Sequence, residues 1–561
     1  MNAQDPPRKP RDLDDPYFQS ERIFPELSDA QVQKLASHGI VEDLPAGTSV
    51  FKRGDRTADF FLILKGCVEI IQHRRAGDEV ITVHGKNQFT GELDLFNTRK
   101  ILVSGRIGPE SGKVLRLKRN EFRQMLASEP EIGEIIMRAF ILRRMGLVVH
   151  RQGGVTLVHR GNTPDKIRIE RFLTRNRYPL ETVDYDAAPD SACIISNRLS
   201  ESQLPAVVLE NLDKVLVNPS VHDLADELGL VEDLDCGVIY DVVIVGAGPA
   251  GLSAAVYAAS EGLRTLVLEG EAPGGQAATS SKIENFLGFP TGTSGQALAD
   301  SAQVQAQKFG ATIALPFAVE GIDCDQRPFV LKLCGGHAVR ATTVIIASGA
   351  HYRSLDVDNS KRFINAGLHY AATVMEAALC ADEEVIVVGG GNSAGQAAVF
   401  LAGRTKGVHL LVRKTGLAST MSQYLEGRIR SSDRITLHPE TEITQLHGDN
   451  RLEGITWRDN SVGETKRLPI RNVFLMIGAQ PNSEWLGSCV ATDSRGFVHT
   501  GADIPTDDAS EERRSKMLET SVPGIFAAGD VRSGSTKRVA AAIGEGGIAV
   551  SHVHDVLGTY L

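Results

Sequence analysis

The sequence predicts an α/β protein whose C-terminal part holds two Rossmann-like, three-layer ββα units, preceded by a β-barrel and a small α/β domain. A buried β-branched strand that breaks into glycines and continues as a helix occurs twice, at 240–260 and at 385–401. Short strands punctuated by glycine fill the first part of the chain and predict the barrel. The length of 561 residues is enough for about three or four domains.

Residues 1–17 are polar and proline-rich, which predicts a flexible tail, and the barrel domain is expected over 18–152. Its strands lead into a turn, Gly91-Glu92-Leu93, and it closes with helical segments from Glu121 to Met145. The whole stretch resembles a cyclic-nucleotide-binding domain. The resemblance implies that Glu92 holds a ribose hydroxyl, that the backbone of Gly91 and Leu93 surrounds a cyclic phosphate, and that Arg99 neutralises this phosphate.

An alternative to nucleotide binding is a barrel that serves as an interaction or regulatory module. The loop before Arg99 is short for the family, and Ile101 and Leu102 stand where small residues are usual. On the helix that leaves the barrel, basic residues are expected to form a solvated face: Arg138, Arg143, Arg144 and Arg151.

Residues 153–236 are expected to form the small α/β domain. An amphipathic helix at 166–174, strands at 180–185, 204–209 and 215–217, and a helix at 221–228 follow one another. This order resembles a thioredoxin or glutaredoxin fold, with Pro205 at the position of that family's cis-proline. The family's redox motif would fall at 160–165, which contains no cysteine, so docking or spacing is the expected role.

The first glycine motif lies between a strand at 242–245 and a helix at 252–260. Gly246 permits the tight turn, Gly248 lets the backbone approach a pyrophosphate, and Gly251 lets the helix pack on the strand. The next strand ends in Glu269, at the spacing where an acid takes the ribose hydroxyls. The pattern predicts a dinucleotide at this turn, with Pro249 and Ala250 opening the helix that faces its phosphates.

Residues 237–354 and 473–561 together resemble the FAD-binding domain of low-molecular-weight thioredoxin reductases. Segments that match that family are Pro273-Gly-Gly-Gln276, Ile283-Glu-Asn-Phe286 and Gly524-Ile-Phe-Ala-Ala-Gly-Asp530. The resemblance implies flavin contacts from Gly275, Gln276 and Asn285, and a ribityl contact from Asp530 beside Gly529. It further implies that the pyrimidine end of the flavin faces a helix start at Arg538, Val539 and Ala540.

The second glycine motif falls in residues 355–472, the expected NADPH-binding domain. It has the form GxGxxA and is made of Gly389, Gly391, Asn392, Ser393 and Ala394. The following strand ends in Arg413 and Lys414 rather than in an acid, and a basic pair favours the 2′-phosphate of NADPH over NAD. The alternative is a basic pair that only faces solvent.

Thioredoxin reductases carry a redox-active Cys-Ala-Thr-Cys just before this second motif. The corresponding residues here are Ala371-Ala372-Thr373-Val374, so both sulfur atoms are missing. The resemblance implies that NADPH delivers hydride to FAD, but no dithiol is present at this site to pass the electrons on. Thr373, Glu376 and His369 are weak catalytic candidates, and packing is an equal alternative for His369. Cys380 and Cys489 are expected to be small buried residues.

The electron acceptor is therefore open: a thioredoxin-like protein, a ferredoxin or a small molecule. One alternative keeps thioredoxin-disulfide reduction through a partner's cysteines or Cys380; another is a sensor whose barrel binds a ligand and gates flavin reduction. Because there is no dithiol to alternate with, the nicotinamide pocket is expected to face the flavin at rest. We also expect a homodimer.

Composition and cysteine spacing limit the expected partners and the expected compartment. The formal net charge of −10 argues against nucleic acid as a partner, and no apolar run is long enough for a membrane span. The cysteines number seven and show no CxxC spacing, so we expect neither a disulfide framework nor a metal site. These features favour a cytoplasmic protein.

Overall fold

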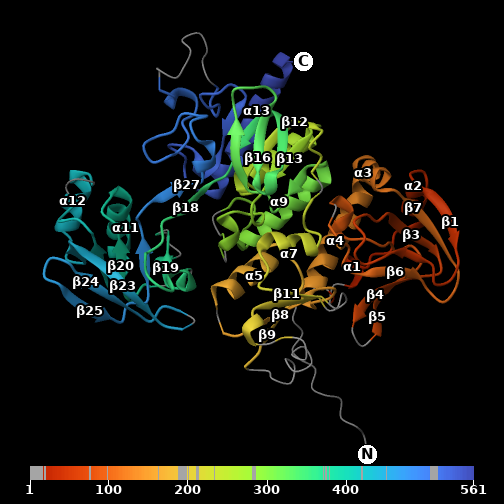
Figure 1. Cartoon of the computed structure of the whole chain (residues 1–561), viewed down its shortest axis with the longest axis horizontal. Coiled ribbons are helices and arrows are strands. Elements are labelled where there is room, and N and C mark those ends of the chain that lie inside the picture. Colours follow the sequence, from red (N-terminus) through yellow and green to blue (C-terminus); the bar gives the residue numbers. More distant parts are fainter. Residues whose placement is uncertain are drawn as a thin grey trace, which may run out of the picture.

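Figure 1 shows the N-terminal sheets in red and orange, a small orange-to-yellow domain and a green and blue domain next to one another, and a cyan domain at the far side, whose residues lie between the green and blue segments in the sequence. The computed structural model describes residues 17, 20–74, 77–97, 99–161, 163–186, 199, 201–209, 214–232, 234–280, 283, 286–364, 366–370, 372, 376–377, 380–417, 421–449, 451–505 and 516–560. Tyr17, which we placed in the tail, donates a hydrogen bond to Gln152 at 2.7 Å.

The N-terminal domain consists of two antiparallel sheets and the helices that follow them. The pairing orders are β1-β7-β3 and β2-β6-β4-β5, so the described strands pair as two sheets. Phenylalanine rings and aliphatic side chains fill the space between the sheets and the helices. The elements are α1 (Ser20–Ile23), α2 (Asp29–Ala36), β1 (Ile40–Leu44), β2 (Ser49–Phe51), β3 (Phe60–Lys65), β4 (Val68–Arg74), β5 (Gly77–His84), η2 (Leu93–Phe96), β6 (Ser104–Ile107), β7 (Gly112–Leu117), α3 (Arg119–Ser128) and α4 (Pro130–Val149).

The small domain has the strand order β11-β10-β8-β9, in which β8 and β9 are parallel and β10 and β11 are antiparallel to their neighbours. The Leu204–Pro205 peptide bond is cis, as the sequence predicted. The helix and strand positions also agree with those predicted. The elements are β8 (Val155–His159), α5 (Pro164–Arg175), β9 (Leu180–Asp184), η3 (Glu201–Gln203), β10 (Ala206–Leu209), β11 (Lys214–Val217) and α7 (Val221–Glu227).

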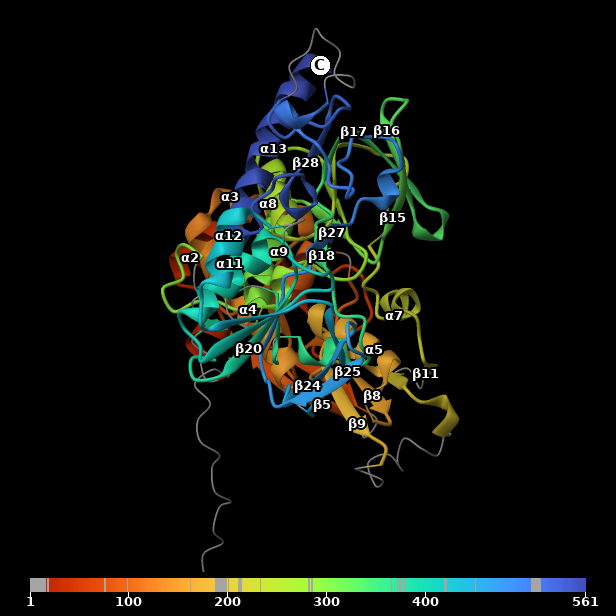
Figure 2. The same cartoon turned by 90° about the vertical axis from the view of Figure 1, so that its left-hand side faces the viewer.

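The first Rossmann-like sheet has the order β14-β13-β12-β17-β16-β15, and β28 adds to β17. Helices α8 and α13 pack on one face, where they run side by side (Figure 2). Strands β16 and β15 extend the sheet from β17 and fold over its other face, where side chains of β16 join those of β12 and β13 in one apolar cluster. The elements are β12 (Ile239–Val245), α8 (Pro249–Ser260), β13 (Thr265–Leu268), η4 (Ala277–Thr279), α9 (Gly295–Phe309), β14 (Thr312–Ala314), β15 (Val319–Asp323), β16 (Phe329–Leu333), η5 (Cys334–Gly336), β17 (Ala338–Ile346), η7 (Glu484–Leu486), η8 (Gly501–Asp503), β28 (Ile525–Ala527), η9 (Gly529–Val531) and α13 (Val539–Tyr560).

The second Rossmann-like sheet is parallel, in the order β19-β26-β20-β21-β22, and an antiparallel sheet β23-β24-β25 adjoins it. An antiparallel ribbon, β18 with β27, connects it to the first unit. The elements are β18 (Ala350–Tyr352), η6 (Ser360–Phe363), β19 (Leu368–His369), β20 (Glu384–Val388), α11 (Asn392–Ala402), β21 (Gly407–Leu411), α12 (Gln423–Arg430), β22 (Ile435–His438), β23 (Thr441–His447), β24 (Gly454–Asp459), β25 (Glu464–Leu468), β26 (Val473–Leu475) and β27 (Ala479–Pro481).

The predicted boundary at residue 473 is wrong. Val473 pairs with Leu368 and Ile386, so β26 is a strand of the second sheet, not of the first. The apolar run 473–475 is buried between β19 and β20, and a buried apolar strand looks the same in sequence whichever sheet it joins. The chain crosses between the units at the ribbon β18–β27.

A disulfide between Cys324 and Cys489 also corrects the sequence analysis, which expected no disulfide framework and a buried, unpaired Cys489. The two Cα atoms are 5.9 Å apart although 165 positions separate them in the sequence. The disulfide ties the end of β15 to the segment after η7 and packs beside the apolar face of the first sheet. The cysteine argument for a reducing compartment therefore no longer holds. In the described part of the chain, no helix combines the length and apolarity needed to cross a bilayer.

Candidate functional site: two dinucleotide turns

The first glycine turn is held by close backbone contacts. Gly246 has φ +104°, and a Cβ atom there would lie 2.4 Å from the carbonyl oxygen of Ala347. A Cβ atom on Gly251 would lie 1.9 Å from the carbonyl oxygen of Gly246, so α8 can approach β12 only through glycine. Pro249 follows as the first helical residue and Ala250 is buried behind it. The predicted strand–turn–helix is present, with Gly246 in the tight turn and Gly251 at the strand–helix contact as expected.

Gly248 differs from these two glycines because a Cβ atom built there would point into largely open space. The nearest atom to a Cβ built there is the Cα of Gly275, at 4.0 Å. Gly275 itself has φ +54°, and its own Cβ would lie 3.1 Å from the Cα of Gly248. The backbones of the two glycines are therefore in van der Waals contact, and the rest of the space beside Gly248 is open. We call this open side of the turn, next to Gly275, the Gly248–Gly275 cradle. The sequence predicts that a pyrophosphate approaches the backbone at Gly248 and that Gln276 and Asn285 contact a flavin; Gln276 follows Gly275, and Asn285 lies outside the described residues.

Glu269 lies directly beside the turn because Leu268 of β13 is in register with Val245 of β12. Its carboxylate accepts hydrogen bonds from the backbone N–H of Ala247 at 2.9 Å and of Glu271 at 3.0 Å. Burial raises the pKa of Glu269, although its backbone hydrogen bonds and the charge of the nearby Arg175 oppose the shift. Among the described residues no cation forms an ion pair with this carboxylate, so oxygen lone pairs remain for a hydroxyl-bearing ligand.

The C-terminal segment completes this site. The backbone N–H of Gly529 donates to Glu545 of α13 at 2.6 Å, and Arg532 pairs with the same carboxylate at 2.6 Å. Burial raises the pKa of Asp530, and Lys537 donates to its carbonyl oxygen at 2.6 Å. Helix α13 begins at Val539, with Ala540 in its first turn; the carbonyl oxygen of Arg538 accepts from the N–H of Ala542 at 3.0 Å. The predicted residues are thus at a helix start beside the Gly529 turn.

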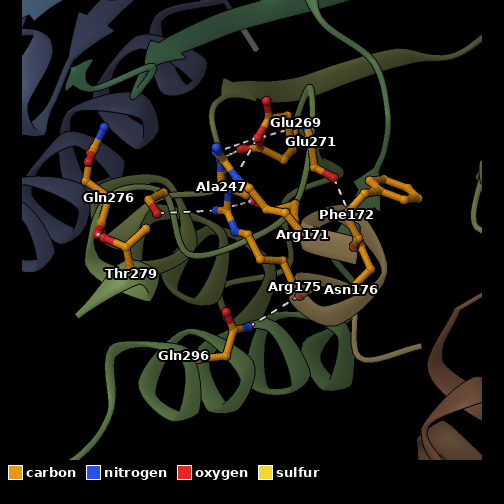
Figure 3. Close-up of polar contacts among 12 residues, drawn as sticks. Arg171, Phe172, Arg175, Asn176, Ala247, Glu269, Glu271, Gln276, Thr279 and Gln296 are labelled. Atoms are coloured by element: carbon orange, nitrogen blue, oxygen red, sulfur yellow. Dashed lines mark hydrogen bonds and ion pairs between the residues drawn. The ribbon is translucent and has the colours of Figure 1, made fainter. Parts of the chain in front are cut away.

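Helix α5 of the small domain docks on the loop after Glu269 (Figure 3). Arg175 donates to the carbonyl oxygens of Ala272 at 3.2 Å and Gly275 at 3.3 Å, and lies 3.4 Å from the Glu271 carboxylate. Arg171 reaches the same carboxylate at 2.9 Å, and Asn176 donates to the Glu271 carbonyl oxygen at 3.1 Å. The small domain therefore fixes one wall of the Gly248–Gly275 cradle.

The second glycine turn repeats the arrangement between β20 and α11. Gly389 has φ +144°, and a Cβ there would lie 2.4 Å from the carbonyl oxygen of Met476. Gly391 caps α11, and Ala394 is fully buried at the strand–helix contact. Asn392 and Ser393 lie in the first turn, where the Asn392 side chain accepts from the N–H of Ser422 at 2.8 Å.

Arg413 and Lys414 directly follow the buried end of the neighbouring strand β21 and are both exposed. The backbone carbonyl of Lys414 accepts from the N–H of Glu440 at 3.1 Å, which fixes the turn that carries the pair. Leu411 is in register with Val388 as Leu268 is with Val245, so Val412 stands at the position of Glu269 and the basic pair follows it. Positive charge in the second unit therefore lies one and two residues beyond the position of the carboxylate in the first.

The region of the replaced cysteine pair is described in part. Thr373 lies outside the described residues, as do Ala371 and Val374, so the expectation about which group faces the flavin at rest stays a prediction. His369 is buried on β19, hydrogen-bonds Asn472 at 3.0 Å and stacks on Phe474, which supports the packing alternative. Glu376 accepts a hydrogen bond from the Cys380 thiol on its backbone carbonyl.

Cys380 is buried, as predicted, with 1% of its surface exposed. Burial raises the pKa of its thiol to about 11, and the carboxylates of Glu383 and Glu376 add to the shift. A thiol with so high a pKa is almost wholly protonated near neutral pH and is a poor nucleophile. The burial and the high pKa of Cys380 argue against it as a redox nucleophile in this position. In the described part of the chain, no cluster of three or more His, Cys, Asp or Glu side chains is placed to hold a metal ion.

In the N-terminal domain, the predicted nucleotide acid has a protein partner. The Glu92 carboxylate accepts a hydrogen bond from Nε of Arg144 at 2.6 Å and a second one from Nη2 of the same guanidinium. Nη2 also donates to the Asp94 carboxylate at 2.5 Å. Burial would raise the pKa of Glu92, but the guanidinium overrides it and the pKa is lowered. Gly91 and Leu93 flank this acid, and Arg99 lies near it, with a pKa that burial lowers.

Sequence reasoning missed the importance of three arginines. Arg143 and Arg144 are 7% and 8% exposed, so the prediction of a solvated face is wrong for them, whereas Arg138 is exposed and pairs with Glu134. The missed signal is helical spacing: both follow buried Phe140 by three or four positions. Arg175 had no comparable signal, because its partners lie about a hundred positions away in the sequence.

The comparisons with known proteins agree with this geometry. Residues 240–546 match the family described as pyridine nucleotide-disulphide oxidoreductase, and residues 41–129 match the cyclic nucleotide-binding domain. The chain is 34% identical to the thioredoxin reductase of Mycolicibacterium smegmatis over 310 residues, which cover 55% of this chain and 93% of that one. It is 33% identical over 316 residues to the thioredoxin reductase of Bacillus subtilis, covering 56% of this chain and 94% of that protein.

Among solved structures, the thioredoxin reductase from Streptococcus pyogenes MGAS5005 aligns with a TM-score of 0.51 and 30% identity, over 57% of this chain and 99% of that one. The family match extends from the strand before the first glycine turn to the helix that follows Asp530, and it includes the second turn. The chain therefore belongs to the pyridine nucleotide-disulphide oxidoreductase family, as a thioredoxin reductase-like oxidoreductase that carries a cyclic nucleotide-binding domain at its N-terminus.

Proposed function

We propose that this protein is an NADPH-dependent FAD oxidoreductase that passes its electrons to an acceptor without a redox-active dithiol of its own. The observation that carries the proposal is the sequence Ala371-Ala372-Thr373-Val374 at the position where thioredoxin reductases carry their cysteine pair. Both dinucleotide turns keep the residues that binding requires. The input of electrons is thus retained and the usual output is lost.

The first turn suits FAD. The open side of the turn at Gly248 lets a pyrophosphate approach the start of α8, and Glu269 keeps acceptor oxygens for ribose hydroxyls. Asp530 and the start of α13 would hold the ribityl chain and the flavin. When bound, FAD supplies the two-electron carrier that nicotinamide chemistry needs.

The second turn suits NADPH. Gly389 and Gly391 shape the phosphate-binding start of α11, and the exposed Arg413 and Lys414 are available for a 2′-phosphate. A hydrogen bond to a charged group is worth about 1.5–3 kcal/mol, so this pair favours NADPH over NADH by roughly ten- to a hundredfold.

The Cys324–Cys489 disulfide does not replace the missing pair. Asp323, the residue before Cys324, pairs with Val330, which in turn pairs with Arg340 and so with Ile239 at the start of β12. The glycine turn lies at the other end of β12. At strand spacing the disulfide is therefore about 20 Å from the turn along the strand direction, which argues against direct exchange with a flavin held at the turn.

For the small domain we propose a thioredoxin-like fold that has a docking role. Its strand order β11-β10-β8-β9 and cis Leu204–Pro205 bond support the fold, and the absence of cysteine from 160–165 argues against dithiol chemistry. The contacts of Arg175 with the flavin loop support docking. A homodimer and a cytoplasmic location stay proposals, without support from the contacts described above.

An acceptor screen with the purified, FAD-loaded protein tests the function. Anaerobic NADPH should bleach the visible flavin band, and thioredoxin, ferredoxin, a quinone and dioxygen are then added separately to follow its return. We expect reoxidation that is unchanged in Cys380→Ser and in the double variant Cys324→Ser/Cys489→Ser. Thioredoxin turnover that either variant abolishes would restore a dithiol route and overturn the proposal, as would a flavin band that NADPH leaves intact.

A further inference from the structure

The N-terminal domain encloses a cavity of about 70 Å³ between its sheets and helix α4. The lining is mainly apolar and includes Phe51, Ile70, Ile81 and Leu147. Three buried polar side chains, His84, Asp94 and Arg143, also line it, together with the carboxylates of Asp59 and Glu92. A cavity with apolar walls and a few buried polar atoms is the usual form of a small-molecule site.

Arg143 is a buried cation without an anionic partner among the described residues. Its guanidinium donates to the carbonyl oxygens of Ile23, Phe89 and Gly91, each at 3.0 Å, and the ring of Phe89 lies 4.8 Å away. Its Nη2 atom has no hydrogen-bond partner in the described structure. Burial lowers the pKa of Arg143 to about 9, so the side chain still carries its charge at neutral pH. A buried charge in this state is costly unless a counter-ion joins it.

His84 provides a second unsatisfied atom on the same cavity. It is 2% exposed, and its Nδ1 has no partner in the described part of the chain. Burial, and then the charge of Arg143, keep the pKa of His84 well below its usual range, so the ring is neutral. A neutral imidazole can donate one hydrogen bond to an oxygen atom without repelling a cation beside it.

The neighbouring acid excludes the ligand that the domain's family name suggests. Glu92, which would take a ribose hydroxyl, is already bound bidentately by Arg144, and Asp94 shares the same guanidinium. A cavity of about 70 Å³ is also far below the roughly 300–1,000 Å³ of pockets that take drug-sized ligands. Arg143 feels the charge of Glu92 but, unlike Arg144, forms no ion pair in the described part of the chain, so a small anion can still pair with it.

We propose that this cavity binds a small carboxylate with a short apolar chain, whose oxygen atoms contact Arg143 and His84. The carboxylate supplies the missing counter-charge and satisfies the unpaired Nη2 and Nδ1 atoms, while the chain lies against Ile70, Ile81 and Leu147. Neither Glu92 nor Arg99 takes part in this recognition. The proposal is independent of the electron acceptor and holds whether or not the flavin is reduced.

Calorimetry and thermal unfolding of the full-length, FAD-loaded protein test the proposal with a series of sodium carboxylates: acetate, butyrate, hexanoate, octanoate and benzoate. Cyclic AMP and cyclic GMP serve as comparison ligands. We expect butyrate to bind and raise the unfolding temperature of the N-terminal domain, octanoate to bind more weakly, and the cyclic nucleotides to give no heat. Binding of a cyclic nucleotide without binding of any carboxylate would overturn the proposal.

The matched variants are Arg143→Met and Arg138→Met, which remove the same group from one helix, once in the cavity and once on the surface. Arg143→Met should weaken butyrate binding by about tenfold or more, because a charge-assisted pair is lost, and Arg138→Met should leave it unchanged. If Arg143→Met does not fold, Ile81→Phe fills the cavity without touching the guanidinium and should abolish binding. Unchanged binding in Ile81→Phe would place the ligand elsewhere and refute the site.

Discussion

Two acidic residues of this chain stand next to glycine turns, and the structure gives them opposite surroundings. Glu269 accepts hydrogen bonds from the N–H groups of Ala247 and Glu271, and no cation pairs with it among the described residues. Glu92 is held by both arms of Arg144 in a buried ion pair. An acid beside a glycine turn is thus available to a ligand in the first Rossmann-like domain, whereas in the N-terminal domain it is held by another side chain of the protein. A fingerprint predicts a ligand only where its acceptor atoms remain free.

The largest effect is expected at the glycine turn beside Glu269, whose carboxylate is available to a ligand. Gly248→Val should give a folded protein without FAD, because the new side chain has only Gly275 as a neighbour and would occupy the open side of the turn, where the pyrophosphate approaches the start of α8. The ratio of flavin to protein absorbance measures loading, and circular dichroism checks the fold. Gly427→Ala on α12, where a Cβ also meets no atom within 4 Å, is the control and should stay fully loaded. A yellow Gly248→Val protein would show that the cofactor does not use this turn.

The next largest effect is expected at Glu92, whose carboxylate is held in the ion pair with Arg144. Arg144→Met should destabilise the N-terminal domain by about 3–5 kcal/mol, because Glu92 and Asp94 are left buried without their cation. Denaturant unfolding followed in this domain measures the loss. Arg138→Met removes an exposed arginine paired with Glu134 and should cost at most about 1 kcal/mol. Equal losses in the two variants would mean that Glu92 is not tied up as described.

The second dinucleotide turn extends the comparison, since its neighbouring strand β21 is followed by a basic pair and not by an acid such as Glu269. Arg413→Ala/Lys414→Ala should lower the ratio of kcat/KM for NADPH to that for NADH by roughly ten- to a hundredfold, through loss of contacts to the 2′-phosphate. Steady-state reduction of a dye acceptor with each nucleotide measures the ratio, and Lys406→Ala is the exposed control. A loss that is the same for both nucleotides would assign the pair to general electrostatics.

A smaller effect sharpens the role of the docked helix α5. Arg175→Met should raise the dissociation constant of FAD by about three- to tenfold, because the loop at Ala272 and Gly275 loses its hydrogen bonds. Arg171→Met, whose side chain is 55% exposed, should change it little. Release of FAD fluorescence on dilution gives both constants. If the two variants behave alike, the small domain does not support the cradle.

Local pattern was enough to predict the two strand–turn–helix units, because glycine spacing, β-branched strands and the acid after β13 are all encoded within about thirty residues. The long-range features escaped prediction. Arg175 meets the flavin loop, and Cys324 meets Cys489, only after distant segments have packed together. Val473 is an apolar strand residue that fits either sheet, so its place beside β20 follows from pairing rather than composition.

The burial of Arg143 and Arg144 lies between these cases. Their spacing from Phe140 placed them on the buried face of α4, yet charge alone suggested solvent. An arginine side chain is buried only where carboxylates or carbonyl oxygens can accept its hydrogen bonds. Here those acceptors belong to Glu92, Asp94 and the turn at Gly91, about fifty positions earlier in the sequence. A helix pattern predicts which side of a residue faces inward; the partner that makes burial possible is a tertiary fact.

An anaerobic titration of the FAD-loaded protein with NADPH tests most directly whether the chain has lost its internal dithiol. We predict that the flavin band is fully bleached by about one NADPH per FAD and that no further nucleotide is consumed, because the flavin is the sole two-electron store. Consumption of about two NADPH per FAD, with new thiols at Cys324 and Cys489, would reveal a disulfide in exchange with the flavin and contradict the proposed function.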